Sequence, residues 1–143
     1  MNDLIVVSSA FIEGEFIPQK YTCEGIDVNP PLKVINIPKE AKCLALIVED
    51  PDVKSGLWTH WMVWDIPLDR EIKEDSKIGI EGMNSFLKMK YMGPCPPDGV
   101  HRYYFRFFAL SKMLKLAPGS SRETFEKALK GKILSEGKLL GKF

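Results

Sequence analysis

The sequence predicts a mainly β protein, a β-sandwich with one or two short helices near the C-terminus. Three segments, 43–49, 58–66 and 101–110, are rich in β-branched and aromatic residues, and prolines, glycines and acidic turns separate them. Only one segment, which follows residue 119, has apolar residues at helical spacing. Several short strands with one late helix favour a sandwich over a parallel sheet of alternating strands and helices.

The first long strand is predicted over 43–49, directly before Asp50, Pro51 and Asp52. Proline has no backbone N–H and cannot extend a hydrogen-bonded ladder, so we expect the strand to stop at this triplet. Such an end would place the carboxylates of Asp50 and Asp52 together at the end of a strand.

The next two strands bring histidines and aromatic residues together, because side chains alternate between the two faces of a strand. In the strand predicted over 58–66, alternation groups on one face Trp58, His60, Met62 and Trp64. In the strand predicted over 101–110, one face would carry His101, Tyr103, Phe105 and Phe107. The opposite face of that strand would carry Arg102, Tyr104 and Arg106.

The single helix is predicted to begin at a capping box formed by Ser120 and Glu123. Phe125, Ala128 and Leu129 follow at helical spacing and would face the core. Gly131 is a natural stop for this helix.

Length and charge exclude several classes of protein. The 143 residues fall in the range of one globular domain, so we interpret 1–143 as a single domain. A formal net charge of +1 provides no global field that would favour nucleic acid or an anionic membrane as the main partner. The longest apolar runs, such as 44–48, are too short to span a bilayer. The opening residues lack the pattern of an export signal, so we expect a cytoplasmic protein.

The three cysteines are Cys23, Cys43 and Cys95. Their odd number, their wide spacing and the absence of a CxxC pair favour reduced, partly buried thiols over a disulfide framework or a cysteine zinc site.

The only two histidines, His60 and His101, lie in the segments that contain the most unusual residues. An acidic neighbour raises the pKa of a histidine and favours its cationic, doubly donating form. Two imidazoles beside carboxylates are therefore suited to a phosphate or carboxylate pocket, to which Tyr103 could add a neutral donor. The alternative is that each histidine is a hydrogen-bonded, partly buried strand residue.

A proline-rich segment precedes the third strand. Pro94, Pro96 and Pro97 fix the backbone and leave few free N–H groups, which could give a pocket a rigid rim. The same residues could equally form a purely structural turn.

Several segments resemble, in order, the phosphatidylethanolamine-binding protein family, also called the Raf kinase inhibitor family, in its short bacterial and archaeal branch. The segments are 21–32, Asp50-Pro51-Asp52, His60-Trp61, Asn84-Ser85-Phe86, 93–103 and 131–134. The combination of Asp-Pro-Asp with Gly-Val-His-Arg-Tyr is more specific for this family than either motif alone.

This resemblance implies an antiparallel β-sandwich in which a large sheet packs on a smaller one, with a pocket for phosphoryl or other anionic groups at one edge. Arg102 would face away from it. We expect the chain to lack the C-terminal helix that larger eukaryotic members carry beside the pocket, and on this ground we do not expect their kinase-inhibitor role. A homodimer would suit the family. The pocket lining that the resemblance implies is Asp50, Asp52, Trp58, His60, Cys95, Pro96, Pro97, His101 and Tyr103.

Three functions compete at this point. The leading hypothesis is non-enzymatic binding of a small anionic, phosphate-bearing ligand, with a signalling or inhibitory use and without cofactor, metal or catalytic residues. The second is a protease or kinase inhibitor that acts through its surface. The third is a metal-assisted hydrolase with two histidines and one aspartate as ligands, although HExxH, GxSxG and P-loop patterns are absent from the sequence.

Overall fold

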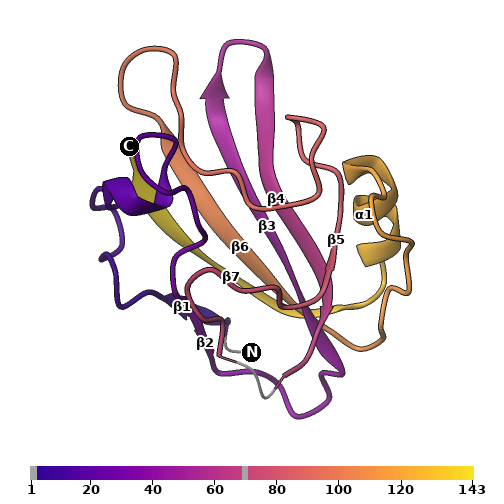
Figure 1. The fold of residues 1–143 in the computed structure, drawn as a ribbon. Coiled ribbons are helices and arrows are strands. Elements are labelled where there is room, and N and C mark those ends of the chain that lie inside the picture. The colour runs from indigo at the N-terminus through magenta and orange to yellow at the C-terminus, as the bar shows by residue number, and fades with distance from the viewer. Residues whose placement is uncertain (1–2, 69–70) are drawn as a thin grey trace.

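The computed structural model describes residues 3–68 and 71–143. It contains two antiparallel sheets, one α-helix near the C-terminus and one 3-10 turn (Figure 1). Residues 1–2 and 69–70 of the predicted domain lie outside the described ranges. The elements are β1 (Ile5–Val7), η1 (Gln19–Tyr21), β2 (Lys33–Ile35), β3 (Cys43–Val53), β4 (Gly56–Ile66), β5 (Ile80–Glu81), β6 (Arg102–Leu110), α1 (Arg122–Leu129) and β7 (Ile133–Lys142).

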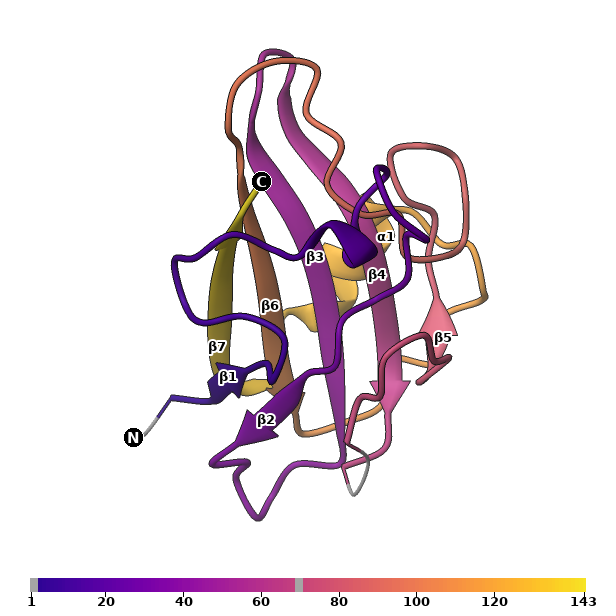
Figure 2. The ribbon, with the colours of Figure 1, turned by 60° about the vertical axis from the view of Figure 1, so that its left-hand side comes forward.

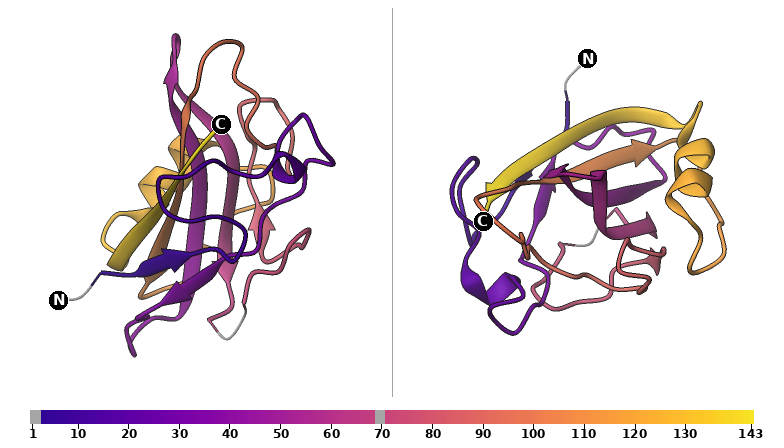
Figure 3. Two further views of the ribbon diagram at one scale, coloured as in Figure 1. Left: turned by 90° about the vertical axis from the view of Figure 1, so that its left-hand side faces the viewer. Right: turned by 90° about the horizontal axis from the view of Figure 1, so that it is seen from above.

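The larger sheet has the strand order β5-β4-β3-β6-β7, and the smaller sheet pairs β1 with β2. The long β3–β4 hairpin extends beyond the rest of the large sheet (Figures 1 and 2). The predicted sandwich of a large and a small sheet is confirmed. Figure 3 shows β1 and β2 on one side of the large sheet and α1 on the other.

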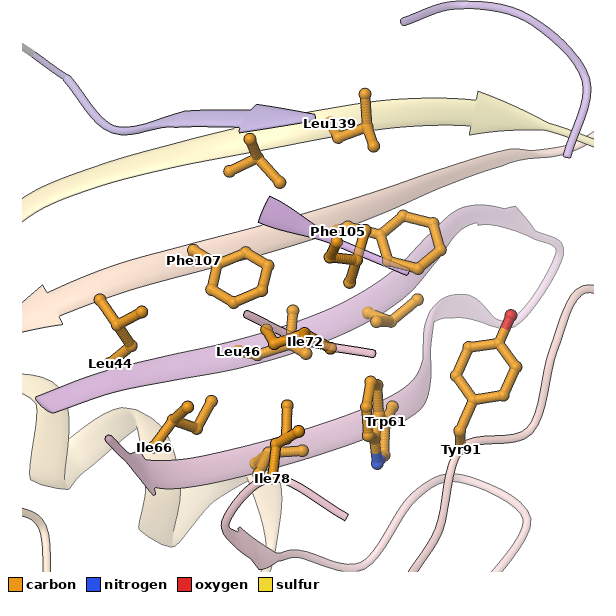
Figure 4. Close-up of a cluster of buried hydrophobic side chains, with 14 of the residues drawn as sticks. Leu44, Leu46, Trp61, Ile66, Ile72, Ile78, Tyr91, Phe105, Phe107 and Leu139 are labelled. Carbon is orange, nitrogen blue, oxygen red and sulfur yellow. The ribbon is translucent and has the colours of Figure 1, made fainter. Parts of the chain in front are cut away.

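The main core lies between the large sheet and the N-terminal segment. Apolar side chains of four strands point to the same side of the sheet (Figure 4). Burial of each large apolar side chain contributes about 1.5–3 kcal/mol, so this face provides most of the driving force for folding. Its fully buried members include Leu44, Leu46, Trp61, Phe105, Phe107 and Leu139.

The opposite face of the sheet is covered at one end by α1. Phe125 and Leu129 of the helix pack with Met62 and Trp64 of β4. The predicted helix is confirmed, but it begins one residue later, because the hydroxyl of Ser121 accepts the hydrogen bond from Thr124 N at 3.2 Å.

The neighbouring Ser120 instead donates its hydroxyl to the carbonyl of Ala117 at 2.6 Å. At the other end of the helix, Gly131 has a φ of +77°. This left-handed conformation is suited to glycine and explains why the helix ends there.

The prediction that the first long strand ends at Pro51 is wrong, since β3 continues to Val53. Pairing with β6 ends at Glu49. Pairing with β4 is irregular between Asp50 and Val53. Pro51 therefore lies where no ladder hydrogen bond requires its missing N–H.

The prediction that four large residues share one face of β4 is also wrong. Val48 pairs with Trp61 and the next residue of β3, Glu49, pairs with Thr59, so β4 contains one extra residue, His60. This bulge shifts the alternation. Met62 and Trp64 pack on the helix side, whereas Trp58 and His60 line a cavity on the other side.

The prediction for β6 is confirmed. Tyr103, Phe105 and Phe107 belong to the main core, and the ring of His101 stacks with that of Tyr103 at 6.5 Å between centroids. Arg106 lies on the opposite face, where it contacts the ring of Phe108. Within the described ranges, no helix is long and apolar enough to cross a membrane.

Candidate functional site

A cavity of about 220 Å³ opens where the β3–β4 hairpin meets the segments 82–92 and 93–101. Most of the predicted pocket residues line it: Asp50, Trp58, His60, Cys95, Pro96, Pro97 and Tyr103. Val53 and Phe86 also line the cavity and were not predicted. Phe86 had a signal in the sequence, because it belongs to the Asn84-Ser85-Phe86 motif, but Val53 had none.

Two predicted residues, His101 and Asp52, lie behind the cavity wall rather than in it. His101 Nδ1 donates to Asp50 Oδ2 at 2.6 Å. Asp52 accepts hydrogen bonds from the backbone N–H of Arg102 at 2.8 Å and from its guanidinium at 2.7 Å. The hydrogen bonds from Arg102 hold the pKa of Asp52 at about 2. Arg102 faces away from the cavity, as predicted.

Asp50 connects these groups. Its side chain is buried, and besides the bond from His101 it accepts one from the backbone N–H of Asp52 at 2.7 Å. A buried carboxylate is stable only when such donors satisfy it. The backbone N–H of Asp52 and the imidazole of His101 thus hold the Asp50 carboxylate from two sides.

The protonation state of His60 differs from the prediction, which was a cationic imidazole that donates two hydrogen bonds. Its Nδ1 lies 2.6 Å from the carbonyl oxygen of Met92. A carbonyl only accepts, so Nδ1 carries the proton. Burial lowers the pKa of His60 below its ordinary value, and this effect outweighs the opposing effects of the hydrogen bond to Met92 and of the charge of Asp50. His60 is therefore neutral near pH 7, and its Nε2 is a hydrogen-bond acceptor.

Tyr103 contributes a donor. Its hydroxyl is buried and makes no hydrogen bond with the residues that the structure describes, although the Asp50 carboxylate is close enough to act on it. Burial, followed by the negative charge of Asp50, raises the pKa of Tyr103 well above its ordinary value, so the hydroxyl keeps its proton. A buried, unpaired donor lowers the stability of the folded protein by about 1–3 kcal/mol, and a hydrogen bond to a ligand oxygen would restore this free energy.

Aromatic rings surround these polar groups. The ring of Phe86 contacts Trp58 at 5.6 Å and His60 at 5.3 Å, both edge to face. Tyr103 contacts His60 in the same way at 5.4 Å. The rings keep the polar atoms in a fixed geometry inside a largely apolar cavity.

Comparisons with known proteins agree with this architecture. The family model described as phosphatidylethanolamine-binding protein matches residues 7–143. The chain belongs to the phosphatidylethanolamine-binding protein family. A UPF0098 protein of Pyrococcus abyssi is 48% identical over an alignment of 150 positions, which covers 97% of this chain and 84% of that protein.

Solved structures of the family have the same fold. A phosphatidylethanolamine-binding protein homologue from Chlamydia trachomatis is 39% identical, with a TM-score of 0.95 over 100% of this chain and 98% of that chain. YbcL of Escherichia coli, described as a member of the mammalian family, is 25% identical, with a TM-score of 0.90 over 99% of this chain and 98% of its own.

In this family member, Asn84 organises one side of the cavity. Its Oδ1 accepts from the backbone N–H groups of Phe86 at 2.9 Å and Lys88 at 3.0 Å. Its Nδ2 donates to the carbonyl of Lys90 at 2.8 Å and to that of His60 at 3.4 Å. One buried amide therefore joins the β4 bulge to the segment that carries Phe86. Sequence reasoning placed Asn84 in a motif but gave it no role.

The prediction of three reduced thiols is wrong for Cys23 and Cys95, which form a disulfide across 72 residues of sequence. The backbone brings them together, because Cys23 N donates to the carbonyl of Pro94 at 3.1 Å and Gly93 N donates to Asp27 Oδ1 at 2.8 Å. Spacing along the sequence does not reveal this tertiary contact. Cys43 is a buried free thiol, and burial raises its pKa to about 11.

No group of three or more histidine, cysteine, aspartate or glutamate side chains in the described part of the chain could hold a metal ion. Asp50 and His101 do lie together, but His60 directs its Nδ1 to a carbonyl. The ligand set of the hydrolase hypothesis is thus not assembled among these residues.

Proposed function

We propose that the protein binds a compact phosphoryl-bearing ligand in the cavity next to His60 and Tyr103, without transforming it chemically. The observation that carries this proposal is the pairing of one donor with one acceptor. The Tyr103 hydroxyl is unpaired among the described residues, and the neutral His60 offers Nε2. The two rings are in contact, with 5.4 Å between their centroids.

A phosphoryl group matches this pair. A phosphate monoester has a second pKa of about 6, so its monoanion is accessible near neutral pH and carries both P–OH and P–O⁻ oxygens. The P–O⁻ oxygen would accept from the Tyr103 hydroxyl, and the P–OH group would donate to His60 Nε2. The dianion would need a proton on His60 instead. In either case the complex holds one more proton than the separated partners at high pH.

The remaining ionisable groups support binding rather than catalysis in this proposal. Asp50 and His101 are already bonded to each other, and Asp52 is bonded to Arg102. They fix the cavity wall instead of facing a reacting group. A signalling or inhibitory use of the ligand remains a prediction from the family resemblance.

Calorimetric titration with O-phosphorylethanolamine and with inorganic phosphate tests this function. Tyr103→Phe should weaken binding about tenfold or more, because a hydrogen bond to a charged group is lost. Tyr104→Phe is the matched control: Tyr104 lies on the other face of the sheet, where its ring contacts Lys138, and its change should leave the affinity unaltered. Equal affinity in both variants, or no heat of binding in the unmodified protein, would reject the proposal.

A further inference from the structure

The disulfide between Cys23 and Cys95 lies at the rim of the cavity. Cys95 lines the cavity together with Pro96 and Pro97, and Cys23 lies in the N-terminal segment just after η1. Both cysteines of the bond are exposed, whereas the free Cys43 is buried. A dissolved thiol can therefore reach this bond, and the bond holds residues that form the wall of the proposed ligand site.

We call residues 94–100 the rim segment. It contains no helix or strand and runs beside the β3–β4 hairpin (Figures 1 and 2). Backbone hydrogen bonds fix its two ends. At its start, Cys23 N donates to the carbonyl of Pro94 at 3.1 Å, and just after its end His101 N donates to the carbonyl of Phe143 at 2.9 Å. Between these ends, the disulfide ties Cys95 to the N-terminal segment.

The position of Cys95 matters for the ligand site because its backbone lies close to Tyr103. Burial and the Asp50 carboxylate raise the pKa of Tyr103, and the backbone N–H of Cys95 acts on the same hydroxyl in the opposite direction. Pro96 and Pro97 follow Cys95 with a restricted φ, so a shift of Cys95 would move both prolines. The disulfide therefore positions this part of the wall next to the Tyr103 donor.

Other contacts would keep the joined segments together after the bond is broken. The hydroxyl of Tyr91 donates to the carbonyl of Tyr21 at 2.8 Å, and both side chains are buried. Gly93 N donates to Asp27 Oδ1 at 2.8 Å. These contacts lie directly before the rim segment. Reduction would therefore loosen the rim segment without separating the N-terminal segment from it, and the two thiols would stay close enough to form the bond again.

We propose that the Cys23–Cys95 disulfide is a redox control site for the cavity, which binds the phosphoryl ligand tightly in the disulfide form and weakly in the dithiol form. This inference rests on the proposed function and adds its regulation. A thiolate of a dithiol reductant attacks one of the two sulfur atoms, the S–S bond breaks, and the other cysteine leaves as a thiolate that takes up a proton. The second thiol of the reductant then loses its proton and displaces the first cysteine from the mixed disulfide. Two electrons pass to the protein, and the reductant becomes a disulfide.

The effect on affinity follows from the order of the rim segment. In the disulfide form the wall is ordered before the ligand arrives, whereas in the dithiol form binding must order it. Reduction should therefore weaken binding about tenfold, which is a usual size for coupling between two events in one protein. Because such coupling is reciprocal, saturating O-phosphorylethanolamine should favour the disulfide form in a thiol redox buffer by the same factor.

Calorimetric titration with O-phosphorylethanolamine compares the oxidised protein with protein kept reduced by dithiothreitol. The oxidised protein should bind about tenfold more tightly. The double variant Cys23→Ser, Cys95→Ser should bind like the reduced protein and should not respond to dithiothreitol. Leu129→Ala is the matched control for lost stability, because Leu129 is buried on the helix side of the sheet. This variant should keep both the tight binding and the response to dithiothreitol.

A measurement without ligand separates this inference from the proposed function. Backbone ¹⁵N relaxation of residues 95 and 98–100 should show lower order parameters in the reduced protein than in the oxidised protein. If O-phosphorylethanolamine binds to neither form but the order parameters still fall, the proposed ligand is wrong and redox control of the wall is supported. Equal order parameters in the two forms, or equal affinities in the oxidised and reduced protein, would overturn the redox proposal even where the cavity binds the ligand.

Discussion

Nδ1 of His60 lies 2.6 Å from the carbonyl oxygen of Met92, at the point where β4 contains one residue more than its partner strand. The bulge turns the histidine toward the cavity, and the carbonyl determines which nitrogen carries the proton. The electrostatic character of the cavity thus follows from a backbone irregularity.

His60 should make the stability of the protein depend on pH below about 6.5. Burial lowers the pKa of His60 in the folded state below its ordinary value of 6.5, so in this range the unfolded chain binds more protons than the native protein. Stability therefore decreases as pH falls below about 6.5. His60→Asn, whose amide could still donate to Met92, should flatten this slope in urea unfolding measured from pH 5 to pH 8. An unchanged slope would contradict the buried neutral histidine.

Asp52 should contribute to stability in a lower pH range. The Arg102 hydrogen bonds lower the pKa of Asp52 from 3.8 to about 2. The stabilisation is therefore complete above pH 4 and disappears as the pH falls toward 2. Asp52→Asn should remove this part of the acid transition, which circular dichroism can follow. An acid transition identical to that of the unmodified protein would show that the ion pair is not formed.

Asp50→Ala should destabilise the protein by about 3 kcal/mol, because it leaves the buried His101 without its acceptor. Asp52→Ala should cost only about 1 kcal/mol, since its partner guanidinium is largely in solvent. Urea unfolding at pH 7 measures both values. Equal losses in the two variants would refute the different roles of the two carboxylates.

The disulfide between Cys23 and Cys95 should stabilise the fold by about 4 kcal/mol, because it closes a loop of 72 residues in the unfolded chain. Unfolding with and without reductant measures this contribution. The double variant Cys23→Ser, Cys95→Ser should be insensitive to reductant. A thiol assay on denatured, unreduced protein should detect only Cys43, and detection of all three cysteines would contradict the bond.

Asn84→Ala should destabilise the protein by about 2–3 kcal/mol, since several buried backbone groups lose their partner. Asn84→Asp separates the two roles of the amide: it keeps the acceptor for Phe86 and Lys88 but places a carboxylate against the carbonyl of Lys90. We expect both variants to lower the affinity for O-phosphorylethanolamine. Preserved stability and affinity would show that Asn84 does not position the cavity wall.

The sequence predicts the fold well where periodicity is regular. The alternation in β6 correctly placed Tyr103 and Phe105 on the core face, and the apolar spacing correctly located α1. Prediction from the sequence failed at backbone irregularities. The bulge at His60 depends on how β4 pairs with β3, and no local sequence pattern encodes this pairing. The same limit applies to Pro51, which is tolerated inside β3 only because the ladders on both sides are interrupted there.

The chemistry of the candidate site was predicted in part. Motifs identified the residues that surround the cavity, but the charge state of His60 and the bond between Cys23 and Cys95 depend on burial and on contacts between distant segments. Phe86 and Asn84 were visible only as members of a motif. Their roles follow from hydrogen bonds that the three-dimensional arrangement creates.

The most direct test of the proposed site is ¹⁵N nuclear magnetic resonance of the His60 side chain during titration with O-phosphorylethanolamine at pH 7. We predict that the free protein shows a neutral imidazole protonated at Nδ1, and that the ligand shifts the Nε2 resonance toward its hydrogen-bonded or protonated position. A cationic His60 in the free protein, or ligand binding that leaves Nε2 unchanged, would contradict the proposed site.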